Sequence, residues 1–199
     1  MTLELVKQNI SNNFSSAAKT YNQYSELQKE VAAEVFFRIK NKIMPGHQIL
    51  DLGCGTGYLA KIINAEMLLS GFSNPALEIT QVDISHEMVA AASQIKNTKT
   101  IQADMEKLPL PYDSFDIVIS SLAAQWGDLT KILREVRRVK KTAAPYIIST
   151  LGQESFKEIR QDFPEINLRN MHNIDSIKKK LEEAKIPNLF VKRQLIKKE

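Results

Sequence analysis

Three glycines separated by single residues form the part of the sequence best suited to bind a small molecule. The segment at positions 49–60 reads ILDLGCGTGYLA, with glycine at positions 53, 55 and 57. Glycine has no Cβ, so the backbone here can approach a ligand closely. The apolar residues on either side predict a buried strand before the glycines and a helix after them. Open α/β sheets bind their ligands at such a turn.

The details of this segment argue against a phosphate-containing ligand. A nicotinamide site needs the spacing G-x-G-x-x-G, but Tyr58 stands three residues after Gly55 and the third glycine, Gly57, comes one residue early. Asp51, two residues before the first glycine, would repel a pyrophosphate and suits a cationic ligand. No G-K-[ST] sequence follows, which excludes a Walker loop.

The segment resembles the D-x-G-x-G-x-G motif of the class I methyltransferases. Their cofactor, S-adenosylmethionine, carries an ammonium and a sulfonium and has no phosphate. The resemblance implies that Asp83, at the end of the next strand, binds the ribose hydroxyls and that Asp104 accepts a hydrogen bond from the adenine amino group. It also implies that Met105 either packs on the adenine ring or offers its backbone N–H to it. The complete set of expected cofactor-binding residues is Asp51, Gly53, Gly55, Gly57, Asp83, Ile84, Asp104, Met105 and Ser120. Cys54 is expected only to be a small residue within the turn.

Alternating strands and helices are expected to position these residues. Apolar residues at i, i+4 spacing predict a helix over 16–41. The predicted strands cover 48–52, 78–82, 100–102, 115–120 and 146–151, and the predicted helices between them cover 58–69, 86–96 and 129–140. The last part of the chain suggests a helix near 174–181 and a strand over 189–196. Strands separated by helices of this length predict a parallel sheet in a Rossmann-like α/β fold.

The length of 199 residues fits one domain. We expect a helical cap over 1–44, a cofactor-binding core over 45–151 and a substrate-side segment over 152–199. The chain has no apolar run of the ~20 residues that span a bilayer, no signal peptide and a single cysteine, which together predict a cytoplasmic protein. The three histidines lie far apart, so no metal site is expected, and no nucleic-acid-binding motif is present.

Other segments are similar to one narrower family, the malonyl-acyl-carrier-protein O-methyltransferases of biotin synthesis. These segments are FSSAAKTYNQYSELQKEVA at 14–32, SSLAAQW at 120–126, STLG at 149–152 and FKEIR at 156–160. The resemblance implies that the protein converts the free carboxylate of a malonyl group on acyl carrier protein to a methyl ester. A carboxylate has a pKa near ~4 and is ionised at neutral pH, so this reaction needs no general base. The sequence shows no evident nucleophile–base pair, which is consistent with that chemistry.

The acceptor pocket and the partner surface are expected from the same resemblance. Tyr21, Tyr24, Gln125 and Trp126 are candidates to line the pocket, and Arg169 is a candidate to bind the acceptor carboxylate. Basic residues gather at 134–141 and again at 178–198, within a net charge of +4. These clusters would serve either as solvated faces or as a docking surface for the acidic carrier protein.

Two departures from the family pattern leave alternatives open. The loop before the fifth strand reads KKTAAP at 140–145 where the family has a Lys-Pro-Gly-Gly-like turn, and the C-terminal edge of the fold is expected to be truncated. A different acceptor, such as a quinone precursor, a small acid or RNA, is one alternative. A non-methylating relative that assists assembly or hydroxylation in respiratory complexes is a second, and a binding-only protein is a third.

Overall fold

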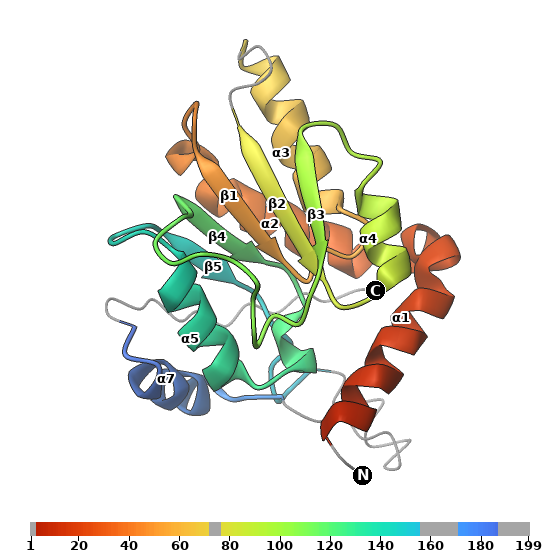
Figure 1. Cartoon of the computed structure of the whole chain (residues 1–199), viewed down its shortest axis with the longest axis vertical. Coiled ribbons are helices and arrows are strands. Elements are labelled where there is room, and N and C mark those ends of the chain that lie inside the picture. Colours follow the sequence, from red (N-terminus) through yellow and green to blue (C-terminus); the bar gives the residue numbers. More distant parts are fainter. Residues whose placement is uncertain (1–2, 72–76, 156–170, 187–199) are drawn as a thin grey trace.

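The computed structural model describes residues 3–71, 77–155 and 171–186, with the side chains of residues 3, 4, 6 and 17–24 left out of the description. Five parallel strands form one sheet in the order β3-β2-β1-β4-β5 (Figure 1). The strands are β1 (Gln48–Leu52), β2 (Glu78–Asp83), β3 (Thr98–Gln102), β4 (Ile117–Ser120) and β5 (Tyr146–Ile148). The strand order reverses between β1 and β4, and the glycine loop follows β1 at that point. The predicted Rossmann-like fold is therefore confirmed.

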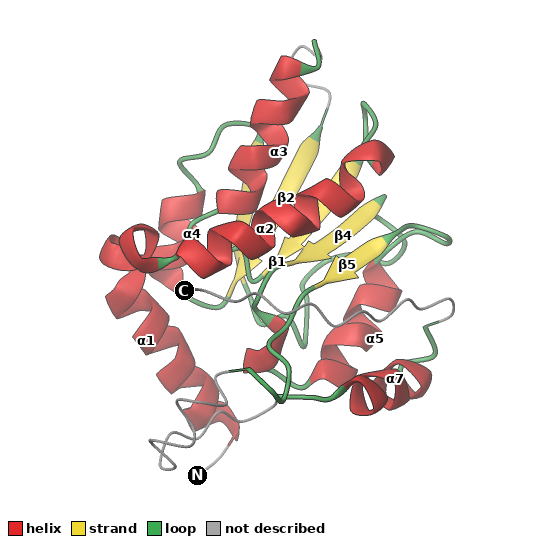
Figure 2. Ribbon diagram, turned by 180° about the vertical axis from the view of Figure 1, so that it is seen from behind, coloured by secondary structure: helices red, strands yellow, loops and turns green. Residues whose placement is uncertain are grey.

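Helices cover both faces of the sheet, as expected for parallel strands. On one face lie α2 (Glu26–Ile39) and α3 (Tyr58–Leu69), which Figure 2 shows in front of the strands. On the other face α5 (Leu129–Val139) packs against α7 (Ile174–Glu183). Ile49 belongs to the apolar core under α2 and α3, whereas Leu50 and Leu52 belong to the core under α5. This alternation along β1 places the side chain of Asp51 on the same face as that of Ile49.

The single helix predicted over 16–41 is two helices. The break lies at Ser25, which separates α1 (Leu3–Tyr24) from α2 and adopts φ −98° and ψ 34°. The two helices pack against different partners, because α1 contacts α4 (His86–Ala92) and α2 contacts α3. Apolar spacing predicted α2 well but could not show that the chain changes direction at Ser25, a residue type that favours helix ends.

The other elements differ from their predicted bounds by a few residues. Ser85 caps α4 as predicted, because its hydroxyl accepts a hydrogen bond from the amide of Met88, but the helix ends at Ala92. Phe115 lies outside β4 and makes an isolated bridge with Lys140. Two short 3₁₀ helices, η1 (Lys40–Lys42) and η2 (Ala124–Trp126), complete the described elements. The strand predicted over 189–196 lies outside the described residues.

The loop from Lys140 to Pro145 makes its turn without a glycine. The Lys141 amide donates to the Phe115 carbonyl, and the Ala144 amide donates back to the Lys141 carbonyl. Ala143, inside this turn, adopts φ +63°, a left-handed conformation that glycine enters at less cost. The departure from the family's glycine-containing turn is thus accommodated by an alanine in a strained conformation.

Candidate functional site

The glycine loop is held against β2 by backbone hydrogen bonds. The amides of Gly53 and Cys54 both donate to the carbonyl of Val82, at 2.8 and 3.0 Å. Gly53 adopts φ +67°, and a Cβ on it would lie 2.2 Å from the Cβ of Ala123. Only glycine fits this position, so the loop passes directly beneath the segment that follows β4.

The third glycine has a packing role. Gly57 adopts φ +78° and precedes the first residue of α3. A Cβ on Gly57 would lie 2.2 Å from Cδ1 of Ile95 and 2.5 Å from Oε1 of Gln81. Gly57 lines neither of the hollows described below. The structure thus shows a role for Gly57 in the close packing of α3 against its neighbours, and its expected contact with the cofactor stays a prediction.

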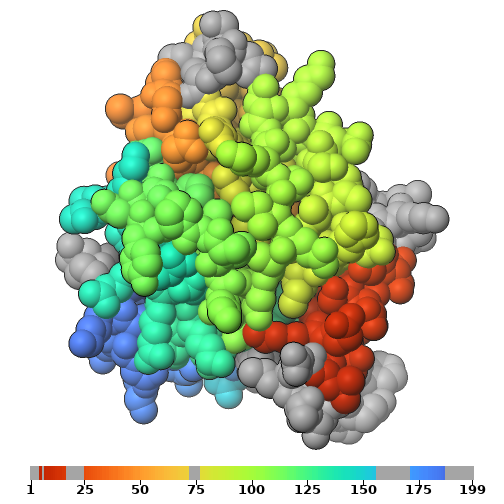
Figure 3. All heavy atoms as spheres, viewed as in Figure 1, coloured from red at the N-terminus to blue at the C-terminus, as the bar shows by residue number. Residues whose placement is uncertain are grey.

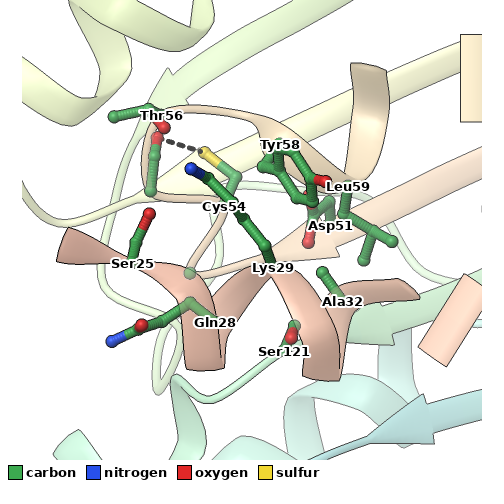
Figure 4. A pocket seen from close by; sticks show the side chains of 12 residues that line it. Ser25, Gln28, Lys29, Ala32, Asp51, Cys54, Thr56, Tyr58, Leu59 and Ser121 are labelled. Carbon is green, nitrogen blue, oxygen red and sulfur yellow. Dashed lines mark hydrogen bonds between the residues drawn. The ribbon is translucent and has the colours of Figure 1, made fainter. Parts of the chain in front are cut away.

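Two hollows meet at the glycine loop. The first hollow, drawn in Figure 4, lies between the loop and α2. Its lining residues are Ser25, Gln28, Lys29, Ala32, Asp51, Gly53, Cys54, Gly55, Thr56, Tyr58, Leu59 and Ser121. The second hollow lies between β2, β3 and α1, and is lined by Ile10, Phe14, Gly53, Gly55, Val82, Asp83, Ile84, Ala103, Met105, Ser121, Leu122, Ala123 and Trp126. Gly53, Gly55 and Ser121 border both hollows, so one elongated ligand could occupy the two together.

Asp51 is a buried carboxylate at the edge of the first hollow. Its exposed fraction is 1%, and among the described residues its Oδ2 atom has no hydrogen-bond partner. Burial, and then the nearby carboxylate of Asp83, raise the pKa of Asp51 to about 7. A cationic group in the hollow would supply the missing partner and favour the ionised form.

Asp83 holds the loop and borders the second hollow. Its Oδ2 atom accepts a hydrogen bond from the Gly55 amide and its Oδ1 atom from the Ser85 amide, each at 2.9 Å. Burial raises the pKa of Asp83, while amide hydrogen bonds act in the opposite direction. The neighbouring Ile84 and, across the hollow, Met105 also line the second hollow.

Helix α1 covers one side of the second hollow. Ile10 and Phe14 line it, and the Phe14 ring meets Trp126 edge to face, with ring centroids 5.3 Å apart. The Ser11 hydroxyl donates to the carbonyl of Ile84 at 3.2 Å. Figure 3 shows the atoms of α1 packed against the neighbouring part of the molecule. Because Ile10 and Phe14 line the second hollow, α1 forms one of its walls.

Asp104, expected to accept a hydrogen bond from adenine, is paired with α1 in this structure, and its role toward adenine stays a prediction. Its carboxylate forms an ion pair with Lys7, which also lies 2.8 Å from Oε2 of Glu106. Asp104 does not line the second hollow, although Ala103 and Met105 on either side of it do. In this structure Asp104 therefore links α1 to the segment that follows β3.

The segment after β4 places Ser121 at the site. The Ser120 hydroxyl is buried and donates to the carbonyl of Leu52 at 2.8 Å, while Ser121 lines both hollows. Ser121 is thus the residue of this pair that borders the hollows, and the expected contact of Ser120 with the cofactor stays a prediction. The Gln125 side chain is also buried, and its amide donates to the carbonyl of Leu122 at 2.7 Å. Gln125 therefore holds the conformation of the segment that follows β4, whereas Trp126 lines the second hollow.

Several residues at the site were missed by sequence reasoning, and others lie outside the described part. Lys29 and Ala32 on α2 and Ser25 just before it are spaced as on one helix face, which could have indicated a common face toward the loop. Tyr21 and Tyr24 belong to the end of α1, but their side chains are not among those described. Arg169 lies outside the described residues. Burial, with the Asp51 and Asp83 carboxylates adding to it, raises the pKa of the Cys54 thiol well above its ordinary value, so this thiol is not activated.

The described residues also set limits on other kinds of site. Within residues 3–71, 77–155 and 171–186, no group of three or more His, Cys, Asp or Glu side chains could hold a metal ion. In the same part of the chain, no helix has the length and apolar character needed to cross a membrane.

Two curated relatives carry the same description. The chain is 32% identical over 162 residues to a malonyl-[acyl-carrier protein] O-methyltransferase of Halorhodospira halophila, an alignment that covers 79% of this chain and 52% of the relative. It is 33% identical over 163 residues to the corresponding protein of Erwinia pyrifoliae, covering 80% of this chain and 58% of that one. The chain thus spans between half and three fifths of the length of these relatives.

Solved structures and a family model agree with the fold. A methyltransferase from Aquifex aeolicus, described as SAM dependent, has a TM-score of 0.64 at 22% identity, covering 85% of this chain and 87% of that one. A putative methyltransferase in complex with the Haloferax volcanii Trm112 activator has a TM-score of 0.71 at 19% identity, covering 86% and 75%. At these identities the likeness shows the fold alone. The model of the methyltransferase domain matches residues 43–193, which include the sheet and the glycine loop, and the chain therefore belongs to the methyltransferase domain family.

Proposed function

We propose that this chain binds S-adenosylmethionine across the two hollows and transfers its methyl group to the free carboxylate of malonyl-acyl carrier protein. The observation that carries the cofactor assignment is the buried Asp51 oxygen, which has no partner among the described residues and borders a hollow beside a glycine loop. When bound, S-adenosylmethionine supplies a methyl group on a sulfonium and an ammonium that a carboxylate can pair with. Neither end of this ligand carries a phosphate, in keeping with the acidic side chains at both hollows.

The chemical character of the residues that line the second hollow matches the nucleoside part of this ligand. The second hollow combines apolar walls from Ile84 and Met105 with the carboxylate of Asp83, a combination suited to an adenine ring and ribose hydroxyls. Gly53 lies at the junction of the hollows, where a Cβ would have no room. The roof formed by Ile10 and Phe14 would exclude water from the junction, and exclusion of water favours a reaction between charged groups.

The acceptor is proposed from the similarity to the malonyl-acyl-carrier-protein methyltransferases together with the chemistry of the site. No Ser, Cys or Tyr that lines a hollow is hydrogen-bonded to a histidine in the described part of the chain, as activation of a nucleophile would require. An acceptor that is already an anion needs no such base, because a carboxylate is ionised at neutral pH. Catalysis would then depend on alignment of the reacting atoms. We also propose that the reaction takes place in the cytoplasm, a reducing compartment in which Cys54 would remain a thiol.

The test is mass spectrometry of malonyl-acyl carrier protein after incubation with the protein and S-adenosylmethionine. We expect the mass of the acyl group to rise by one methylene unit, and the Asp51→Asn variant to give no product. Free malonyl thioester is the control for recognition of the carrier. Absence of a methyl ester on both substrates, with S-adenosylmethionine bound, would exclude the proposed acceptor and favour another one, such as a quinone precursor or a small acid.

A further inference from the structure

The lining of the first hollow contains one cationic side chain. Of the residues that border the two hollows in the described part of the chain, Lys29 is the only lysine or arginine. It lies on α2, one helical turn after Ser25 and three residues before Ala32, which line the same hollow. Figure 4 shows its side chain pointing from α2 toward the glycine loop.

The first hollow is therefore lined by one acidic side chain, Asp51, and one basic side chain, Lys29, which come from different elements. Asp51 belongs to β1 and lies on the face that α2 covers, and the Lys29 side chain projects from α2 toward the glycine loop. The Oδ2 atom of Asp51 has no hydrogen-bond partner among the described residues, so Lys29 does not neutralise this oxygen directly. A ligand with both an ammonium and a carboxylate would complement the pair, with each of its charges facing the opposite charge of the protein.

The second hollow lacks that pairing. Its charged lining residue is Asp83, and the remaining lining is mostly apolar. The two hollows therefore differ in the ligand ends they suit, because a zwitterionic end fits the first and a nucleoside end fits the second.

We propose that Lys29 binds the α-carboxylate of the amino-acid half of S-adenosylmethionine while Asp51 faces its α-ammonium. This assignment rests on the proposed function, and it fixes the direction in which the cofactor lies across Gly53 and Gly55. It also makes Lys29 a cofactor residue and leaves recognition of the acceptor carboxylate to other side chains.

The experiment measures binding of three ligands to the wild type and to Lys29→Met by calorimetry. S-adenosylhomocysteine carries the whole amino-acid end, its decarboxylated analogue retains only the amine, and methylthioadenosine has neither group. We expect Lys29→Met to weaken S-adenosylhomocysteine by about 10–100-fold, the usual effect of losing a hydrogen bond to a charged group. The other two ligands should bind both proteins equally. Lys29→Arg should recover part of the loss.

Lys61→Met, at an exposed position on α3, is the matched control and should leave all three affinities unchanged. Equal weakening of all three ligands by Lys29→Met would overturn the assignment, because it would show that Lys29 only supports α2. Unchanged binding of S-adenosylhomocysteine with a raised KM for malonyl-acyl carrier protein would overturn it in favour of an acceptor-binding role. If the wild type fails to bind S-adenosylhomocysteine, the proposed function itself is wrong.

Discussion

The carboxylate of Asp83 accepts a hydrogen bond from the Gly55 amide at 2.9 Å, which links the end of β2 to the centre of the glycine loop. With the second bond from the Ser85 amide, Asp83 holds the loop and caps the turn that leads into α4. A residue expected only to bind ribose hydroxyls is thus also part of the framework of the site.

Substitution of Asp83 should separate these two roles. Asp83→Ala leaves the Gly55 and Ser85 amides without their acceptor, so we expect the free energy of unfolding to fall by about 1–3 kcal/mol and the affinity for S-adenosylhomocysteine to fall by about 1.5–3 kcal/mol. Asp83→Asn keeps one acceptor oxygen and should cost less stability. Urea unfolding and calorimetry measure the two effects. An unaltered dissociation constant in Asp83→Ala would show that Asp83 holds the loop without contacting the ligand.

Asp51 should make both stability and binding depend on pH. Its folded-state pKa of about 7 lies above the ordinary value of 3.8, so its protonated form is favoured in the folded protein. This contribution to stability is complete below about pH 4 and is lost as pH rises through about 7. We therefore expect the free energy of unfolding of Asp51→Asn, measured in urea, to exceed that of the wild type by roughly 1–3 kcal/mol at pH 8. At pH 4 the two proteins should differ little in this free energy.

Ligand binding should show the opposite trend for the same residue. S-adenosylhomocysteine presents an ammonium, so its affinity for the wild type should rise as Asp51 ionises near pH 7, whereas that of methylthioadenosine should not. Asp51→Asn should bind the former weakly at every pH. A flat pH profile for the wild type would show that Asp51 does not pair with the ligand.

The strained turn before β5 should be relieved by glycine. Ala143 adopts φ +63°, a conformation that costs a non-glycine residue roughly 1–2 kcal/mol, partly offset by the greater backbone entropy that glycine loses on folding. We expect Ala143→Gly to raise the free energy of unfolding by about 0.5–1 kcal/mol in urea. Ala144→Gly, next to it but without a left-handed φ, should lower it. Equal destabilisation by both would argue against strain at Ala143.

The surface proposed to dock the acyl carrier protein must be redefined from the structure. Arg138 lies within hydrogen-bond distance of the Leu108 and Leu110 carbonyls and pairs with Glu135 at 2.7 Å, so it supports the fold. Arg134 and Arg137 are exposed one turn apart on α5 and are the residues that a partner could reach.

Reversing both exposed arginines to glutamate should raise KM for malonyl-acyl carrier protein and leave the affinity for S-adenosylhomocysteine unchanged. The effect should shrink as salt rises, because exposed charges are screened over ~8–10 Å at moderate ionic strength. Reversal of Lys61 and Lys96, exposed elsewhere, makes the same change in net charge and is the control. An equal rise in KM for both double variants would exclude a specific docking site on α5.

Much of the fold could be predicted because its patterns are local. The alternation of apolar strands and amphipathic helices, with the glycines at 53, 55 and 57, predicted the parallel sheet and the location of the loop. The break at Ser25 could not be predicted from spacing, because it depends on α1 and α2 packing against different partners.

The site was less predictable because its details depend on contacts between distant segments. Nothing local distinguishes Gly57, which makes room for Ile95, from Gly53, which borders the hollows. The pairing of Asp104 with Lys7 joins residues 97 positions apart and exists only once α1 lies across the sheet edge. Lys29 and Asp51 line the same hollow only because α2 packs across the glycine loop, a contact that no local pattern indicates.

The central claim, that the two hollows together bind S-adenosylmethionine, is tested most directly by calorimetry with S-adenosylhomocysteine and NAD on the same preparation. We expect S-adenosylhomocysteine to bind with one-to-one stoichiometry and NAD not to bind. The carboxylates of Asp51 and Asp83 border the site and would repel the negatively charged pyrophosphate of NAD. Gly55→Val, at a position with φ +55° beside both hollows, should abolish the binding. Binding of NAD without S-adenosylhomocysteine would contradict the account.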